Sequence, residues 1–148
     1  MRIPLISGTL VAILAVSLLG VLAAAEDEGV KAEEPELISL RFYADWCGYC
    51  RALDATLDEV KEDFQDAAVW FTYVDITDED TIRQSGFKAA QLGLDEIYEE
   101  YGNSTGDMVL VDATTGEVTD HITHEVSEDE LRDRISAAVT EAAGSDTQ

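Results

Sequence analysis

The two cysteines of this chain, Cys47 and Cys50, are separated by two residues and lie where a predicted strand meets a predicted helix. The segment before them, Leu37–Tyr43, is a short run of apolar, β-branched and aromatic residues, which is typical of a buried strand. After them, apolar residues recur at helical spacing as far as Phe64, which predicts an amphipathic helix. Free backbone N–H groups and the helix dipole favour a thiolate at such a helix start. We therefore expect Cys47 to be an exposed nucleophile and Cys50, one turn later, to be a buried resolving thiol.

The rest of the chain predicts an α/β fold. A strand at 69–76 completes a strand–helix–strand unit, so the two strands should be parallel with a right-handed crossover. The later elements are expected to be a helical segment over 78–101 that Gly86 divides, a hairpin of strands at 108–112 and 117–123, and a last helix from Ser127. These elements give one four-stranded mixed sheet with helices on both faces.

The N-terminal segment has the layout of a secretory signal peptide. Met1-Arg2 supplies a positive start, residues 3–25 carry no charge, and Ala23-Ala24-Ala25 offers a cleavage site. The alternative is an uncleaved membrane anchor, because an uncharged stretch of this length can span a bilayer. In both cases the rest of the chain is exported to the periplasm or secreted, where disulfides persist. Residues 26–36 then form an acidic linker, 37–143 the folded domain, and 144–148 a flexible tail.

Composition limits the classes of partner. The chain has 148 residues, and 32 acidic against 9 basic residues give a net charge of −23, which disfavours nucleic acid and anionic membranes. Two cysteines exclude a disulfide-rich scaffold and an all-cysteine zinc site from one chain. His121 and His124 are expected on the surface, because strand alternation does not place them on one face. We expect a monomer without metal or cofactor, in contact with a membrane only through an uncleaved N-terminal segment.

Over residues 37–143 the sequence resembles the thioredoxin-like family. The resemblance rests on residues 42–51, which read Phe-Tyr-Ala-Asp-Trp-Cys-Gly-Tyr-Cys-Arg, and on Val-Leu-Val-Asp at 109–112 with the hairpin that follows. It implies a minimal thioredoxin-like α/β fold and an extracytoplasmic thiol–disulfide oxidoreductase that exchanges disulfides with protein partners. In this resemblance Cys47 matches the attacking cysteine and Cys50 its partner, and the two form a disulfide.

The resemblance also implies roles for the neighbouring residues. Trp46 matches the aromatic residue that shields the pair, and Gly48 and Tyr49 form the dipeptide that tunes the redox potential. A Gly-Tyr dipeptide is similar to that of bacterial periplasmic disulfide isomerases, whereas cytoplasmic thioredoxins usually carry Gly-Pro. Two residues do not fix the potential, so reductant, oxidant and isomerase all stay open.

The sequence departs from the family pattern at four places, one of them Ala55, which aligns with the proline that kinks the cysteine helix in the family. No proline follows Pro35, so the cis-proline before the third strand is absent and Gly106 or Thr105 takes its place. We expect a trans bond there and a more open site with weaker substrate docking. Arg41 replaces a buried acid; it either stabilises a thiolate beside the pair or faces solvent. Too few residues precede the first strand for the family's extra N-terminal strand and helix.

The missing proline keeps a second function in view. A thioredoxin-fold binding module without catalysis would use the Cys47–Cys50 disulfide only as a brace. A third reading, metal or cluster capture by the pair, leaves a tetrahedral ion half-ligated.

Overall fold

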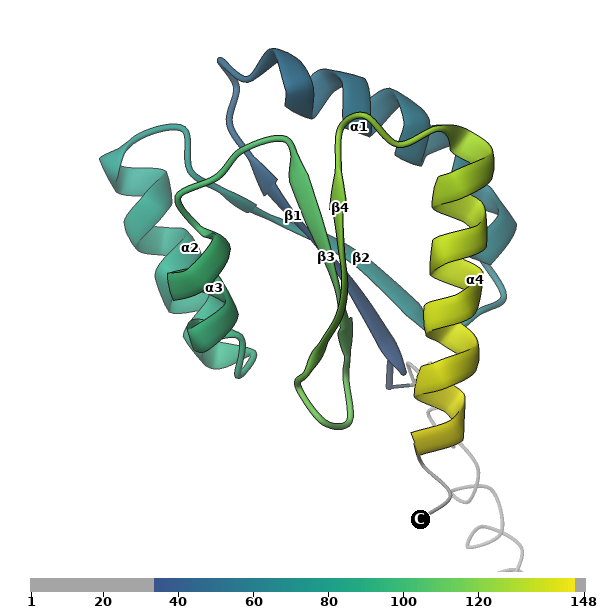
Figure 1. The fold of residues 1–148 in the computed structure, drawn as a ribbon. Coiled ribbons are helices and arrows are strands. Elements are labelled where there is room, and N and C mark those ends of the chain that lie inside the picture. Colours follow the sequence, from purple (N-terminus) through teal and green to yellow (C-terminus); the bar gives the residue numbers. More distant parts are fainter. Residues whose placement is uncertain (1–33, 146–148) are drawn as a thin grey trace, which may run out of the picture. The chain divides into compact units, whose positions relative to one another are not determined.

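The computed structural model describes residues 34–145 (Figure 1). The predicted signal segment, residues 26–33 of the predicted linker and residues 146–148 of the predicted tail lie outside the described residues. The elements in chain order are β1 (Leu37–Tyr43), α1 (Gly48–Val60), the short 3-10 helix η1 (Lys61–Phe64), β2 (Val69–Asp75), α2 (Glu79–Gln91), α3 (Asp95–Tyr101), β3 (Asp107–Asp112), β4 (Val118–Thr123) and α4 (Glu128–Ser145).

The four strands form one mixed sheet in the order β2-β1-β3-β4. Strand β1 is parallel to β2 and antiparallel to β3, and β3 and β4 form an antiparallel hairpin. This arrangement confirms the predicted α/β fold with a four-stranded mixed sheet, its parallel first pair and its final hairpin. Because β1 pairs on both sides, it lies in the centre of the sheet, and the cysteines follow directly from its end.

Helices cover both faces of the sheet (Figure 1). Helices α1 and α4 pack with Leu37 and the alternate residues of β3 on one face. Helices α2 and α3 pack with Ile38, Leu40 and Phe42 on the other. Consecutive residues of a strand point to opposite faces, so β1 supplies side chains to both cores. The buried residues of α1 recur every three or four positions, which aligns its apolar stripe with the sheet and fixes Cys50 on the inner side.

The break in the long helical segment falls at Gly93 rather than at Gly86, so that prediction is wrong. Gly86 lies inside α2, where its close neighbour is the Tyr98 ring of α3. Gly93 has a φ of 70°, and the N–H groups of Gly93 and Leu94 return to carbonyls of the last turn of α2. This is a Schellman ending, which needs the left-handed backbone that glycine adopts readily.

At the other end of the chain, α4 continues through Ser145 and so includes the first two residues of the segment predicted as a tail. One glycine lowers helix stability by about 1 kcal/mol but does not by itself end a helix. None of the helices described between residues 34 and 145 is long and apolar enough to cross a bilayer.

Four loops meet at one edge of the sheet. The parallel strands β1 and β2 end there, β3 begins there because it is antiparallel to β1, and β4 ends there after its hairpin. The loops that follow β1, β2 and β4, and the loop that precedes β3, therefore lie around the start of α1. Such an edge, where the strands of an open α/β sheet end, is the usual place for a functional site.

Candidate active site

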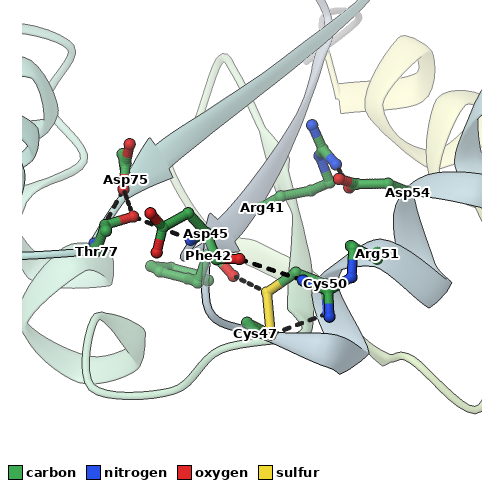
Figure 2. The surroundings of a disulfide bond; sticks show 9 residues. All are labelled: Arg41, Phe42, Asp45, Cys47, Cys50, Arg51, Asp54, Asp75 and Thr77. Carbon is green, nitrogen blue, oxygen red and sulfur yellow. Dashed lines mark hydrogen bonds and ion pairs between the residues drawn. A yellow bond between two sulfur atoms is a disulfide. The ribbon is translucent and has the colours of Figure 1, made fainter.

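Cys47 and Cys50 form a disulfide at the start of α1, with their Cα atoms 5.3 Å apart (Figure 2). Cys47 is the N-cap of the helix and has an extended backbone. Its Sγ accepts a hydrogen bond from the backbone N–H of Cys50 at 2.9 Å. A sulfur in this position receives one of the free donors of the helix start, and a donor of this kind stabilises a thiolate.

The sulfur of Cys50 has a different neighbour. It lies 3.6 Å from the backbone carbonyl oxygen of Phe42, at the end of β1 (Figure 2). A carbonyl oxygen accepts a hydrogen bond from a thiol and repels a thiolate, so it favours the protonated form of Cys50 once the disulfide is reduced. The two sulfurs therefore differ in the charge state that their surroundings favour.

Exposure does not distinguish the two cysteines in the disulfide form; the expected exposure of Cys47 in the reduced protein stays a prediction. Cys47 is 4% exposed and Cys50 is 3% exposed. Both lie in a small apolar cluster with Ala44 and Ile76. The polar contacts of the sulfurs, rather than their exposure, carry the difference between them.

Gly106 occupies the loop against the disulfide helix. All peptide bonds among the described residues are trans, which confirms the expectation for the Thr105–Gly106 bond. Gly106 has a φ of 81°, and a Cβ atom there would lie 2.6 Å from the Cβ of Tyr49. Its N–H donates to the carbonyl oxygen of Phe42 at 3.2 Å. Gly106 is buried, so the loop packs closely on α1 and the expected open site is not found.

Two aromatic side chains border the disulfide on the surface. Trp46 is 63% exposed and Tyr49 is 61% exposed. The Tyr49 ring stacks on His124, with ring centres 3.9 Å apart and planes 27° from parallel. Gly48, between the cysteines, is also exposed. The flanking Arg51 folds back, and its guanidinium donates to the carbonyl oxygen of Asp45 at 3.2 Å.

Arg41 takes up neither of the two expected positions. Its guanidinium pairs with the carboxylate of Asp54 on α1, pointing away from the sulfurs (Figure 2). It also lies over the Tyr73 ring. Burial lowers the pKa of Arg41 from its ordinary value, and the negative charge of Asp58 opposes that shift. The charge of Arg41 is therefore balanced by α1 and is not directed at the cysteine pair.

Three contacts of the site were not anticipated from the sequence. Thr77, in the loop after β2, bonds to both residues before Cys47. His124, expected only as a surface residue, stacks on Tyr49. The Phe42 carbonyl receives both the Gly106 N–H and the Cys50 sulfur. Thr77 and His124 both follow strands that end at the same sheet edge, and this position could have predicted that they lie near the cysteines. The contacts of the Phe42 carbonyl could not be predicted in this way, because every residue has a backbone carbonyl.

Within residues 34–145, no group of three or more His, Cys, Asp or Glu side chains converges as a metal site. A cavity of about 360 Å³ lies between α2 and the outer edge of β2. Its lining includes Tyr73, Asp75 and Lys88 but neither cysteine. The disulfide and its surface border are therefore the chemically distinctive feature of the described domain.

A family model for thioredoxin matches residues 21–89, a stretch that includes both cysteines, β1, α1 and β2. Over these residues the chain is similar to the thioredoxin family. This similarity, together with the Cys-x-x-Cys disulfide, implies thiol–disulfide oxidoreductase activity, with protein thiols and disulfides as partners in general. The resemblance found in the sequence is thus confirmed.

Solved thioredoxin structures resemble the chain at low sequence identity. A thioredoxin from Fasciola hepatica is 21% identical, with a TM-score of 0.47, and the match covers 71% of this chain and 83% of that one. Oxidised thioredoxin from Plasmodium falciparum is 19% identical, with a TM-score of 0.48 and the same two coverages. Thioredoxin 2 from Pseudomonas aeruginosa is 18% identical, with a TM-score of 0.46, covering 74% of this chain and 85% of that one. No curated protein matches the sequence.

Proposed function

We propose that this thioredoxin-family domain works outside the cytoplasm and exchanges disulfides with proteins, with Cys47 as nucleophile and Cys50 as resolving thiol. One observation carries the assignment of roles. The Cys47 sulfur accepts the Cys50 N–H at the start of α1, whereas the Cys50 sulfur faces the Phe42 carbonyl. The first contact favours a thiolate and the second a thiol.

The exchange reaction balances over two displacements. In the reducing direction, the Cys47 thiolate attacks one sulfur of a substrate disulfide, forms a mixed disulfide and releases the first substrate thiolate, which takes a proton from solvent. Cys50 then loses its proton to solvent and attacks the Cys47 sulfur, which releases the second substrate thiolate. The pair is oxidised by two electrons and the substrate is reduced by two. The reverse sequence oxidises a substrate dithiol, and an external dithiol or disulfide partner resets the pair.

Disulfide reduction of insulin tests this function, together with the equilibrium of the pair against glutathione buffers of set potential. We expect turnover in the unaltered chain, none in Cys47→Ser, and an accumulating mixed disulfide in Cys50→Ser, because that variant forms the first bond and cannot resolve it. Brief iodoacetamide treatment of the reduced chain should label Cys47 before Cys50. Equal labelling would remove the assigned roles.

The same assay tests the alternative of a binding module. The absence of the family's cis-proline favoured that reading, because Gly106 stands in its place. A binding module would keep the disulfide but fail to turn over insulin or any smaller disulfide, and its potential would resist reduction by glutathione. Turnover that depends on Cys47 contradicts it.

Export is the second part of the proposal and rests on the sequence of residues 1–25. The expected mature protein begins at Glu26, after cleavage behind Ala25. Fractionation of expressing cells and N-terminal sequencing of the recovered protein test this. A protein that keeps Met1 and sediments with membranes indicates an anchor, and a cytoplasmic protein contradicts export.

A further inference from the structure

Thr77, in the loop after β2, connects that loop to the turn Asp45-Trp46 directly before Cys47. Its hydroxyl accepts a hydrogen bond from the backbone N–H of Asp45 at 3.0 Å, and its carbonyl oxygen accepts one from the indole N–H of Trp46 at 3.0 Å. One residue thus holds the two positions directly before Cys47, through two separate groups. Figure 2 shows Thr77 reaching across to Asp45 from the side of the site opposite Arg41 and Asp54.

Thr77 is itself fixed by Asp75 at the end of β2. One carboxylate oxygen of Asp75 accepts from the Thr77 N–H at 2.9 Å and from the Thr77 hydroxyl at 2.5 Å (Figure 2). Asp75 is anchored in turn, because its N–H and carbonyl both bond to the hydroxyl of Ser85 on α2. The hydroxyl proton of Thr77 therefore points to Asp75, which leaves its lone pairs directed at Asp45.

From this geometry we infer that Thr77 is a positioning residue for disulfide exchange, which holds the turn before Cys47 in place when the disulfide is open. The inference rests on the proposed function, since it concerns the reactivity of Cys47. In the oxidised state the Cys47–Cys50 bond also restrains the turn. In the reduced state that covalent restraint is gone, so the position of the turn depends more on the hydrogen bonds of Thr77. Weakening them destabilises the reduced state more than the oxidised one.

The test is Thr77→Val in the full chain, because valine keeps the branched shape and replaces the hydroxyl with a methyl group. We expect the equilibrium with glutathione to shift about two- to fivefold toward the disulfide, and exchange with insulin to slow about three- to tenfold, the range that a single lost hydrogen bond gives. Thr77→Ser restores the hydroxyl and should return both values close to those of the unaltered chain.

Thr81→Val is the matched control. Thr81 lies four residues later, in the capping box at the start of α2, and its hydroxyl bonds to Asp78 rather than to the cysteine turn. It should lower the melting temperature with no change in the glutathione equilibrium. If Thr77 had a purely structural role, Thr77→Val would behave like Thr81→Val: it would lower the melting temperature and leave the glutathione equilibrium unchanged.

Two further variants keep the inference testable if Thr77→Val does not fold. Asp75→Ala removes the acceptor of the Thr77 hydroxyl and should shift the equilibrium in the same direction by a smaller factor. Trp46→Phe removes the indole bond, and its effect should be non-additive with that of Thr77→Val, because both bonds hold one turn.

The outcomes separate this inference from the proposed function. If the unaltered chain does not exchange disulfides, or Cys47→Ser exchanges as well as it does, the proposed function fails and the role of Thr77 with it. If the unaltered chain exchanges but Thr77→Val matches it in equilibrium and rate, only the inference about Thr77 is overturned. The inference is also overturned if Thr77→Ser does not restore the equilibrium and the rate, or if Thr81→Val shifts the glutathione equilibrium as much as Thr77→Val does.

Discussion

Two loops contact the disulfide region from opposite sides. The loop after β2 forms hydrogen bonds to the turn before Cys47, whereas the loop before β3 packs on α1 with a glycine that has no side chain. Thr77 contacts the turn with a hydroxyl and a carbonyl oxygen. Gly106 contacts α1 because it has no side chain, and its N–H bonds to Phe42. The first side can lose one hydrogen bond without a steric clash. The second side has no room for any added atom, so the two loops should respond very differently to substitution.

Gly106→Ala should have the largest effect. The alanine would carry the left-handed φ of 81° and place its Cβ 2.6 Å from that of Tyr49, a backbone-anchored atom. The left-handed backbone costs about 1–2 kcal/mol and overpacking about 1–3 kcal/mol, so we expect a loss of about 2–5 kcal/mol in the free energy of unfolding. Urea unfolding of the oxidised chain measures it.

Gly116→Ala is the matched control for that experiment. Gly116 has a φ of 73° in the β3–β4 turn, and no heavy atom lies within 4 Å of an added Cβ. It should lose only the conformational part, about 1–2 kcal/mol, and keep its rate of disulfide exchange. Equal losses at Gly106 and Gly116 would show that close packing on Tyr49 contributes nothing.

Proline, the family's usual residue before the third strand, should not be tolerated at Gly106 in the present backbone. Proline fixes φ near −65° and has no N–H, whereas Gly106 has a φ of 81° and donates to Phe42. Gly106→Pro therefore requires a different path for the whole loop. The chain has replaced the family's rigid residue with a different backbone solution, in which the loop is held by a hydrogen bond and by contact with Tyr49.

Much of this fold is encoded in local patterns that can be read without the structure. The apolar run of β1 and the 3-4 spacing of Leu53, Leu57 and Val60 predict a strand and a helix with a fixed buried face, and both are found. The cysteine pair then falls at the helix start by simple counting. The glycines were harder to assign, because sequence does not distinguish Gly86, which packs on a ring, from Gly93, which needs a positive φ.

The contacts around the disulfide depend on how the helices and strands pack together, so local sequence patterns do not predict them. The position of Arg41 follows from the rotation of α1 on the sheet, which brings Asp54 within reach. The stack of His124 on Tyr49 requires the end of β4 and the first turn of α1 to meet, although they are far apart in the chain. Alternation along a strand predicts which face of the sheet a side chain lies on, but not which residue of another element it contacts.

His124→Ala should have an intermediate effect, because it removes support from the far side of Tyr49. Tyr49 is held between Gly106, which contacts its Cβ, and His124, which stacks on its ring. Stacked aromatic pairs contribute about 0.5–1.5 kcal/mol, so the free energy of unfolding should fall by about that amount. Exchange with insulin should change more than exchange with a small disulfide, because Tyr49 borders the surface where a protein substrate would approach.

Two variants sharpen the His124 experiment. His124→Phe keeps an aromatic ring and should restore most of the stability. His121→Ala removes the other histidine, which lies 3.4 Å from Asp107 and edge-on to Tyr101 but does not contact Tyr49. An equal change in insulin exchange in His121→Ala would contradict a specific role for the stack.

Asp120→Asn should have the smallest effect and no effect on disulfide exchange, which makes it the reference for both loops. Asp120 lies on β4, and its carboxylate accepts two hydrogen bonds from Arg134 on α4, one of them at 2.7 Å. The bonds from Arg134 hold the pKa of Asp120 below its ordinary value. Both side chains are about 30% exposed, so solvent screening limits the pair to about 0.5–1 kcal/mol at neutral pH.

The pH dependence of this difference has a definite sign. A carboxyl whose pKa is lower in the folded state stabilises the fold above its unfolded pKa, about 3.9, and loses that contribution as pH falls through the folded pKa. The gap between the unaltered chain and Asp120→Asn should therefore be constant from pH 7 to about pH 5 and shrink below about pH 4. Urea unfolding at these pH values measures the gap, and Asp80→Asn, at an exposed pair with Arg83, should show almost none at any pH. A gap that widens in acid would mean that Asp120 is not held in its charged form by Arg134.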